Sequence, residues 1–234
     1  MLKRKKVAIL QSSYIPWKGY FDIINSVDEF ILLDSVQYTK RDWRNRNVIV
    51  NGEKLTWLTI PVKTKGLYHQ RIEDVRVLDH TWAKRHFATI RHCYCRSAWF
   101  ESYERIFSET WENAAGEDLL CRINKIFIEM VCNLLKIKTK LSISNIYEPE
   151  GKGSSLILDL CIKSGASVYI TGPKARNYLE ENTFTEAGIQ VIYFDYKDYP
   201  EYPQQSPLFR HNVSVIDLIL NTGPAATDYM LSFK

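Results

Sequence analysis

Residues 7–36 read VAILQSSYIPWKGYFDIINSVDEFILLDSV, and this stretch decides the fold class. Residues 6–10 and 29–36 are continuous apolar runs, and between them residues 19–27 carry apolar side chains at helical spacing. Strand, helix and strand within about forty residues form a compact βαβ unit. Strands that are apolar throughout are typical of a parallel sheet with helices on both faces. The stretch therefore predicts an α/β fold with a mostly parallel, Rossmann-like sheet.

The rest of the chain contains a hairpin, a helical segment and a return to strand–helix alternation. In residues 39–62 the turn Asn51-Gly52-Glu53 divides two alternating runs, which predicts a β-hairpin. Between residues 79 and 137 apolar positions recur every three or four residues, as in helices, with a short helix expected over 100–111. Further elements are expected at 140–145, 154–166, 167–172, after Pro173, at 188–196 and at 213–220. We expect a single domain, residues 1–234, interrupted by a helical insertion at about 79–137.

The composition indicates a globular protein that is mildly basic. The 234 residues are 45% hydrophobic and 25% charged, which excludes a mainly disordered chain. The formal charge of +4 favours an anionic small molecule but falls short of the concentrated positive charge of duplex binders. We therefore expect no binding to nucleic acid duplexes.

The sequence also bears on the compartment. The basic residues 1–6 precede an apolar run at 7–10 that is too short for a signal peptide, and no stretch approaches the ~20 apolar residues of a membrane span. The five cysteines are odd in number and lie mostly in segments predicted to be helical, which favours reduced thiols. We expect a cytoplasmic protein without a membrane span.

The loop at residues 11–19, after the first strand, is the first candidate site. Polar groups at the carboxyl end of a parallel strand, beside the start of a helix, form pockets for phosphate or nucleotides. The alternative is a crossover loop in which Pro16 and Trp17 only pack. The candidate substrate-binding residues here are Gln11, Ser12, Ser13 and Tyr14.

Residues 36–47, VQYTKRDWRNRN, interleave cations with aromatic rings and are the second candidate. The cations suit a diphosphate, and the flat rings suit a base or a sugar. The alternative is a solvated charged face. The run begins near Asp34 at the end of a strand, where the first loop is also expected to emerge. The candidates are Gln37, Tyr38, Lys40, Trp43, Arg44, Arg46 and Asn47.

Residues 169–180, YITGPKARNYLE, form a strand-to-helix turn and are the third candidate. A helix beginning at Pro173 would direct backbone N–H groups and Lys174 toward an anion. The segment lacks the spacings of a dinucleotide fingerprint and of a P-loop, so we infer neither. A parallel sheet brings such turns to one edge, where this one can face the other two segments. The candidates are Thr171, Gly172, Lys174 and Tyr178.

No metal site and no catalytic triad can be assigned from spacing. Residues 92–95, HCYC, contain ligand types, but C-x-C without a second pair is not a zinc spacing, so we expect no metal. His86 and His211 are candidate general bases, and for each a structural role is the alternative. The group of Tyr202, Gln204, Arg210 and His211 either reaches the site or closes the fold.

Six motifs, in order along the chain, resemble those of the WbqC-like protein family. They are LQSSYIPWKGYFDII, DSVQYTKRDWRNRN, WLTIPV, ITGPKARNYL, YPQ and SVIDLILNTGP, and the resemblance extends from Val7 to Pro224. It implies a role in O-antigen or other surface-polysaccharide biosynthesis, beside enzymes that make dTDP-linked amino sugars such as 4-amino-4,6-dideoxyglucose. It further implies attachment of an acyl or aminoacyl group, for example glycine, to the sugar amine. The matching positions with suitable chemistry are Gln11, Tyr14, Gly19, Gln37, Tyr38, Arg46, Asn47, Gly172 and Tyr178.

A second, weaker similarity links the first loop to the HIGH-type nucleotidyltransferases, among them pantothenate synthetase. Those enzymes activate a carboxylate as an acyl-adenylate, so the similarity implies ATP or another activated acyl or aminoacyl donor. Lys40, Arg46 and Lys174 would then balance phosphate charge. Where the histidines of that motif belong, residues 17–20 read Trp-Lys-Gly-Tyr.

The leading hypothesis is acyl or aminoacyl transfer to a dTDP-linked amino sugar, with backbone N–H groups near Ser12, Ser13 and Gly172 facing the developing oxyanion. One alternative is a glycosyltransferase of the same pathway, although no DxD-type acidic pair stands out. Another is a non-catalytic module that binds a sugar nucleotide. A homodimer is open as the oligomeric state.

Overall fold

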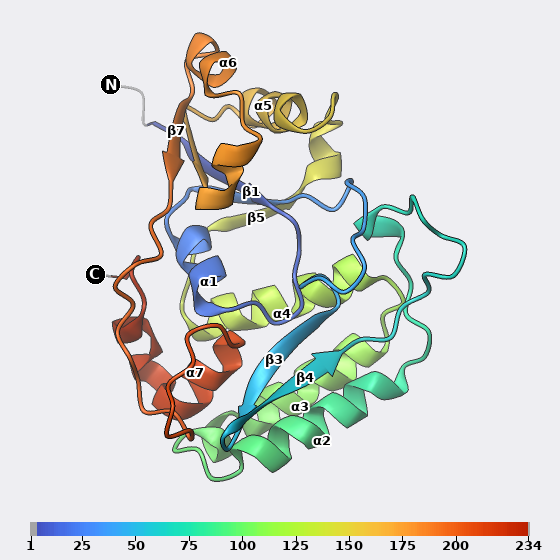
Figure 1. The fold of residues 1–234 in the computed structure, drawn as a ribbon, viewed down its shortest axis with the longest axis vertical. Helices are drawn as coiled ribbons and strands as arrows, with labels where there is room; N and C mark the ends of the chain where they lie inside the picture. Colours follow the sequence, from blue (N-terminus) through green and yellow to red (C-terminus); the bar gives the residue numbers. More distant parts are fainter. Residues whose placement is uncertain (1–3, 234) are drawn as a thin grey trace.

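The structure, a computed structural model, describes residues 4–233, so residues 1–3 of the basic start and residue 234 lie outside the described part. Its centre is a five-stranded sheet in the order β5-β2-β1-β6-β7 (Figure 1). All four pairings between neighbouring strands are parallel, which confirms the predicted α/β fold. The strands are β1 (Lys6–Leu10), β2 (Glu29–Leu32), β5 (Lys140–Ile143), β6 (Val168–Thr171) and β7 (Gln190–Tyr193).

Helices cover both faces of this sheet. Val7 and Ile9 of β1 pack in one cluster of buried side chains, and Ala8 between them packs in another, because successive residues of a strand point to opposite faces. Burial on both faces explains why the strands are apolar throughout. The covering helices are α5 (Ser154–Lys163) and α6 (Glu181–Glu186) on one face, and α1 (Lys18–Asn25) and α4 (Leu120–Leu134) on the other.

The strand order creates a switch point between β1 and β6. The chain runs outward from β1 to β2 and β5, and then returns to β6 and β7 on the other side of β1. The loops after β1 and β6 therefore leave neighbouring strands in opposite directions, and ligands of open α/β sheets bind in the crevice that this arrangement opens. The register pairs Ala8 with Ile170, so both strands end at a similar height.

A long excursion separates β2 from β5 and forms the lower half of the molecule in Figure 1. The helical segment expected at 79–137 is present, although the helix expected to be short over 100–111 has 16 residues. The excursion also contains the predicted hairpin, which pairs as a separate two-stranded sheet. Its elements before α4 are β3 (Arg46–Asn51), β4 (Lys54–Thr59), η1 (Ile72–Asp74), α2 (Thr81–Tyr94) and α3 (Phe100–Ala115). The remaining elements of the chain are η2 (Ser144–Tyr147), η3 (Pro173–Asn177), α7 (Val215–Thr222) and η4 (Gly223–Tyr229).

The last α-helix begins two residues later than the apolar pattern indicates. Ser214 is its N-cap, because the serine hydroxyl oxygen accepts a hydrogen bond from the Ile216 N–H at 3.4 Å. Val213 instead packs with Val48 and Val50 of β3. Apolar spacing alone does not show which valine belongs to the helix and which to the contact with the hairpin.

Asp22 of α1 fixes the C-terminal segment and the loop after β7. Its Oδ1 accepts hydrogen bonds from the N–H groups of Leu231 and Ser232 at 3.0 and 2.7 Å. Its Oδ2 accepts from the Tyr199 hydroxyl at 2.5 Å, and the carboxylate is fully buried. The short helix α1, near the start of the described chain, is therefore bound through Asp22 to residues near the end of it.

Candidate functional site

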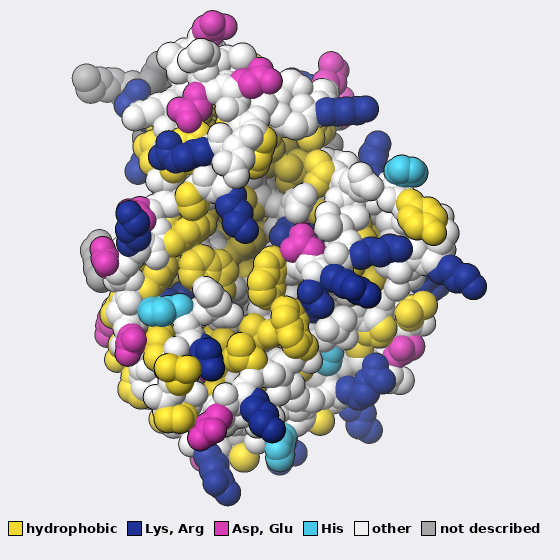
Figure 2. All heavy atoms as spheres, viewed as in Figure 1, with side chains coloured by type: hydrophobic (Ala, Val, Ile, Leu, Met, Phe, Trp, Pro, Cys, Tyr) yellow, Lys and Arg dark blue, Asp and Glu magenta, His cyan; other side chains and the backbone are white. Residues whose placement is uncertain are grey.

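The loops at the carboxyl edge of the sheet meet segments of the excursion. Arg44 donates a hydrogen bond from Nη1 to the Ser12 carbonyl at 3.2 Å, and the Tyr14 N–H donates to the Trp43 carbonyl at 3.0 Å. The first two candidate segments therefore lie in direct contact. Figure 2 shows a hollow between the two halves of the molecule on this face, with hydrophobic side chains in it and Lys and Arg side chains beside it. We call the region formed by residues 11–17, 34–47 and 172–178 the carboxyl-edge site.

The loop after β1 is held by its own polar groups. The buried Ser12 donates its N–H to Asp34 Oδ1 at 3.0 Å, and its hydroxyl accepts from Asn124 at 3.1 Å. The half-buried Gln11 accepts a hydrogen bond at its carbonyl from the Tyr20 hydroxyl. Because the Ser12 N–H already has an acceptor, it is not the oxyanion donor that we expected. The neighbouring Ser13 N–H has no hydrogen-bond acceptor within residues 4–233 and is a free donor in this loop.

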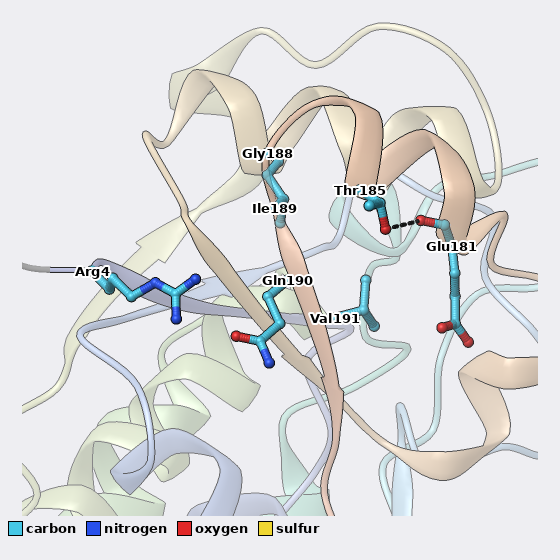
Figure 3. Close-up of a pocket in the computed structure, with 7 residues that line it drawn as sticks. All are labelled: Arg4, Glu181, Thr185, Gly188, Ile189, Gln190 and Val191. Atoms are coloured by element: carbon cyan, nitrogen blue, oxygen red, sulfur yellow. Dashed lines mark hydrogen bonds between the residues drawn. The ribbon is translucent and has the colours of Figure 1, made fainter.

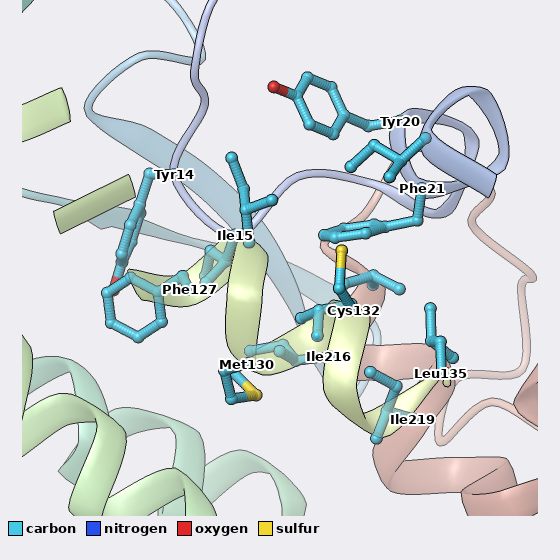
Figure 4. Packing of buried hydrophobic residues seen from close by; sticks show 14 of the residues in the cluster. Tyr14, Ile15, Tyr20, Phe21, Phe127, Met130, Cys132, Leu135, Ile216 and Ile219 are labelled. Carbon is cyan, nitrogen blue, oxygen red and sulfur yellow. The ribbon is translucent and has the colours of Figure 1, made fainter. Parts of the chain in front are cut away.

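Tyr14 and His86 lie in the interior beneath the site. The Tyr14 ring packs against Phe127 and has no solvent exposure (Figure 4). Its hydroxyl is 2.9 Å from His86 Nδ1 and accepts from Trp111 Nε1 at 3.2 Å. Burial lowers the pKa of His86 to about 4, so this imidazole is neutral at physiological pH. We therefore assign both side chains to support of the loop, and we no longer propose His86 as the base.

Asn47 supports the same loop from the hairpin. Its Nδ2 donates to the carbonyls of Tyr14 and Ile15 at 3.1 and 2.9 Å. Ile15 has a φ of 37°, a left-handed conformation that β-branched residues rarely adopt. The two hydrogen bonds from Asn47 hold this strained turn, and the asparagine itself is buried.

The second segment presents an exposed aromatic pair with a cation. The rings of Trp43 and Trp57 stack with centroids 5.7 Å apart, and the Arg46 guanidinium lies 4.3 Å from the Trp57 ring centroid. Trp43 is 44% exposed and Trp57 is 48% exposed. Trp57 was not among the sequence candidates, although the hairpin alternation places it beside Val48 on the same face as Arg46.

The other members of the second segment differ in exposure. Lys40 is exposed and its ammonium lies 5.0 Å from the Tyr68 ring centroid. Gln37 is exposed and donates to the Tyr68 carbonyl, whereas Tyr38 is buried. Arg44 and Arg46 each have a buried Nε–H without an acceptor in the described chain. Buried donors without partners are rare in native structures, and an anionic ligand would satisfy them.

The third segment is more open. Thr171 is buried and accepts from the Tyr169 hydroxyl at 3.2 Å. Lys174 is exposed on η3, whose first residue is Pro173, as predicted, and Tyr178, directly after η3, is 54% exposed. Within residues 4–233, neither side chain forms a hydrogen bond, an ion pair or a ring contact with the first two segments. Their placement at the site rests on the strand order.

A contact through aromatic rings links the loops after β1, β6 and β7. Trp17 packs on Tyr196 with centroids 5.0 Å apart, and a Cβ at Gly172 would lie 3.4 Å from the Tyr196 hydroxyl. Trp17 and Tyr196 are both half-buried, so one part of each ring is open to solvent. Tyr196 was not among the residues predicted from the sequence. The signal for it was the position of residues 193–196, YFDY, at the end of the last strand.

The residues before α7 close the fold. Tyr202 and Gln204 donate to the buried carboxylate of Asp217 at 2.6 and 2.7 Å, and Tyr94 of α2 donates to the same group. His211 is exposed and packs edge-on against Phe209. Partial burial and the nearby Lys18 lower the pKa of His211.

A separate open groove lies at the opposite, amino edge of the sheet (Figure 3). It has a volume of about 510 Å³ and contains none of the candidate residues. Thr185, on α6, donates to the Glu181 carbonyl within its wall. The lining residues are Arg4, Glu181, Thr185, Gly188, Ile189, Gln190 and Val191.

Residues 4–233 contain neither a cluster of metal-ligand side chains nor a helix that could span a membrane. Across residues 4–233, no three or more His, Cys, Asp or Glu side chains gather closely enough to hold a metal ion. No helix in the same part of the chain is both long and apolar enough to cross a membrane.

Comparisons with known proteins place the chain in a family. No solved structure matches it. The uncharacterized protein Rv1507c of Mycobacterium tuberculosis is 40% identical over 226 residues, which cover 97% of each chain. The model of the WbqC-like protein family matches residues 11–229, a span that contains all three segments of the carboxyl-edge site. The chain therefore belongs to the WbqC-like protein family, which is associated with polysaccharide biosynthesis.

Proposed function

We propose that this protein transfers an acyl or aminoacyl group, for example glycyl, to the amine of a dTDP-4-amino-4,6-dideoxy sugar in O-antigen or other surface-polysaccharide biosynthesis. The observation that carries the proposal is the joining of Ser12 and Arg44 at the carboxyl edge of the sheet, beside the switch point where open α/β sheets bind nucleotides. Membership of the WbqC-like family supports the pathway.

The nucleotide diphosphate would lie against the cations of the site. Arg44 is only 13% exposed at its side chain and, like Arg46, has a buried Nε–H without an acceptor. Guanidinium groups bind phosphate oxygens in pairs of parallel hydrogen bonds, and the exposed Lys40 and Lys174 add positive charge. The half-buried rings of Trp17 and Tyr196, or the exposed rings of Trp43 and Trp57, offer flat faces for the base and the sugar.

Residues 17–20 do not fit the phosphate-binding role that histidines have in HIGH-type enzymes. Lys18 is buried, and its ammonium donates to the carbonyls of Pro200 and Tyr229 at 3.2 and 3.3 Å. It also lies 4.5 Å from the Tyr199 ring centroid. This side chain stabilises the fold and is not available to bind phosphate. We therefore propose that the donor is already activated, as an acyl thioester or acyl phosphate, and that the enzyme does not use ATP to activate it.

We place the reaction in the cytoplasm, with a single chain or a homodimer as the working unit. All five cysteines are free, which suits a reducing compartment. Sedimentation velocity distinguishes the two oligomeric states.

Incubation of the purified protein with a dTDP-4-amino-4,6-dideoxy sugar tests the proposal. Separate reactions contain an acyl-CoA, a glycyl thioester, an acyl phosphate, and glycine with ATP, and mass spectrometry detects a new amide on the sugar. We expect product with a thioester or acyl phosphate donor. Binding of the sugar nucleotide without amide from any donor would instead identify a non-catalytic binding module, and release of dTDP in the presence of a lipid-linked acceptor would identify a glycosyltransferase.

A further inference from the structure

Asp34 is a buried carboxylate at the carboxyl end of β2, inside the carboxyl-edge site. It is 8% exposed and follows the strand by two residues. Its carbonyl accepts from the Glu73 N–H at 2.9 Å, which fixes its backbone. Its Oδ1 accepts from the Ser12 N–H at 3.0 Å. Within residues 4–233 it has no ion pair with a lysine or an arginine.

The structure around Ser12 positions this carboxylate. Asn124 of α4 donates from Nδ2 to both the Ser12 hydroxyl and the Arg44 carbonyl, at 3.1 and 2.9 Å. Arg44 in turn donates to the Ser12 carbonyl. Ser12 is therefore fixed through its hydroxyl, its carbonyl and its N–H. The last of these bonds sets the orientation of Asp34.

A comparison with Glu29 shows why Asp34 is unusual. Glu29 is also buried, but Lys5 and Lys140 contact its carboxylate at 2.7 and 2.9 Å, and Ser142 and Tyr147 donate to it. These partners hold the pKa of Glu29 down, at about 2. A buried carboxylate without such cationic partners lowers the free energy of unfolding. A residue with a purely structural role would have no reason to carry this cost.

The charged and titratable groups that face Asp34 come from four other parts of the chain. They are Arg44, Glu73 of η1, Tyr20 of α1 and Cys121 of α4, in addition to Ser12. Burial, with a smaller contribution from Glu73, raises the pKa of Asp34 to about 6 against the lowering effects of Ser12 and Arg44. This carboxylate therefore exchanges a proton close to neutral pH, as a general base must.

We propose that Asp34 is the catalytic base of the transfer reaction, an inference that rests on the proposed function. The amine nitrogen of the sugar attacks the carbonyl carbon of an acyl thioester or acyl phosphate, and a C–N bond forms. The bond from that carbon to sulfur or to the phosphate oxygen breaks, and the leaving group departs with the electron pair. The nitrogen gives its proton to Asp34, and the free Ser13 N–H donates to the transient oxyanion.

The test uses Asp34→Asn, which keeps an acceptor for the Ser12 N–H but cannot take up the proton. We expect kcat to fall about 10²- to 10⁴-fold, while calorimetry shows the affinity for the dTDP-amino sugar unchanged within a few-fold. We also expect the wild-type rate to fall below a pH of about 6, where Asp34 becomes protonated, and this acid limb to be absent from the residual activity of the variant. Asp217→Asn is the matched control, because this buried carboxylate lies outside the site and its loss lowers thermal stability without removing the acid limb.

Glu73→Gln is a second test that does not depend on the folding of Asp34→Asn. The negative charge of Glu73 raises the pKa of Asp34, so removal of this charge should move the acid limb of the pH–rate profile to lower pH. If the Asp34→Asn variant keeps the wild-type rate and acid limb, Asp34 is not the base, but the proposed transferase activity still stands. The same conclusion follows if the pH–rate profile of Glu73→Gln does not shift. A wild-type protein that forms no amide with any donor overturns both proposals.

Discussion

Gly19 is the residue whose lack of a side chain matters most to the site. An added Cβ would lie 2.4 Å from the Trp17 ring, closer than any real contact allows. Trp17 therefore lies flat over the first turn of α1, where it also contacts Tyr196. The glycine is needed for close approach, and its backbone conformation is an ordinary helical one.

Gly19→Ala is expected to displace the Trp17 ring and to lower the free energy of unfolding by about 1–3 kcal/mol. Urea denaturation measures this change, and calorimetry should show weaker binding of the dTDP-amino sugar. Gly116→Ala is the matched control, because its Cβ would meet only the Asn113 carbonyl, at 3.4 Å. Equal stability of the two variants would show that the Trp17 ring is free to move.

Several residues that were predicted from the sequence to bind substrate instead lie buried beneath the site and support it. Tyr14 and Asn47 are polar and follow or begin strands, which is why the pattern selects them, but both are buried. Polarity and position along the chain do not show which way a side chain points. Tyr196 illustrates the opposite case, because its role depends on a contact with Trp17, far away in sequence.

Among the elements, the segment between β2 and β3 is the one that joins sheet and hairpin at the site. Arg44→Gln removes the guanidinium that contacts the Ser12 carbonyl, and we expect the Kd for the sugar nucleotide to rise roughly tenfold, since hydrogen bonds to charged groups contribute about 1.5–3 kcal/mol. Isothermal titration calorimetry measures the effect. Arg105→Gln, which removes an exposed arginine paired with Glu109 on α3, should leave the Kd unchanged. Similar affinities for the two variants would argue against Arg44 as a phosphate ligand.

The edge strand β5 and its neighbour β2 share an ion pair between the exposed Lys140 and the buried Glu29 that makes stability depend on pH. The folded state holds the pKa of Glu29 at about 2, below its ordinary value of 4.5, so the ionised carboxylate stabilises the fold above about pH 4.5. This contribution is lost progressively as pH falls from there toward 2. The free energy of unfolding of Glu29→Gln should be about 3 kcal/mol lower than that of the wild type near neutral pH. It should also fall less steeply as the pH decreases. Urea unfolding at several pH values measures both, and parallel profiles for the two proteins would contradict this assignment.

Element types were predictable from the sequence because each has a local signal. Continuous apolar runs marked β1 and β2, and the Asn51-Gly52 turn marked the hairpin. The length of α3 was underestimated because Glu112 to Ala115 extend the helix with little apolar signal beyond Trp111. Helix ends depend on capping and tertiary contacts that periodicity does not contain.

At the scale of the whole molecule, one continuous core joins the sheet to the helical excursion. A single cluster of buried side chains contains Ala8 and Phe30 of the sheet together with Trp82 of α2 and Phe107 of α3. We therefore propose that the chain acts as one domain despite the length of the excursion. That the loops after β1, β2 and β6 leave the sheet at one edge followed from the general geometry of parallel sheets. The position of the hairpin against this edge is set by long-range packing that no local pattern encodes.

Differential scanning calorimetry tests this proposal. We expect one cooperative transition, with the calorimetric and van't Hoff enthalpies equal within error. Trp82→Ala, which leaves a large cavity in the excursion, should lower that single Tm by several degrees without splitting it. Two separate transitions in either protein would show that the excursion unfolds on its own.

The contacts of Asp22 with residues 231 and 232 also bear on how the chain is made. Asp22 and its partners Leu231 and Ser232 are more than 200 residues apart in sequence, so translation supplies the carboxylate long before the N–H groups that bind it. In the same way β1 is synthesised long before its neighbour β6. A nascent chain that has not yet reached these segments carries the Asp22 carboxylate without these two partners and the apolar face of an unfinished sheet. Exposed apolar surface of this kind is what chaperones cover.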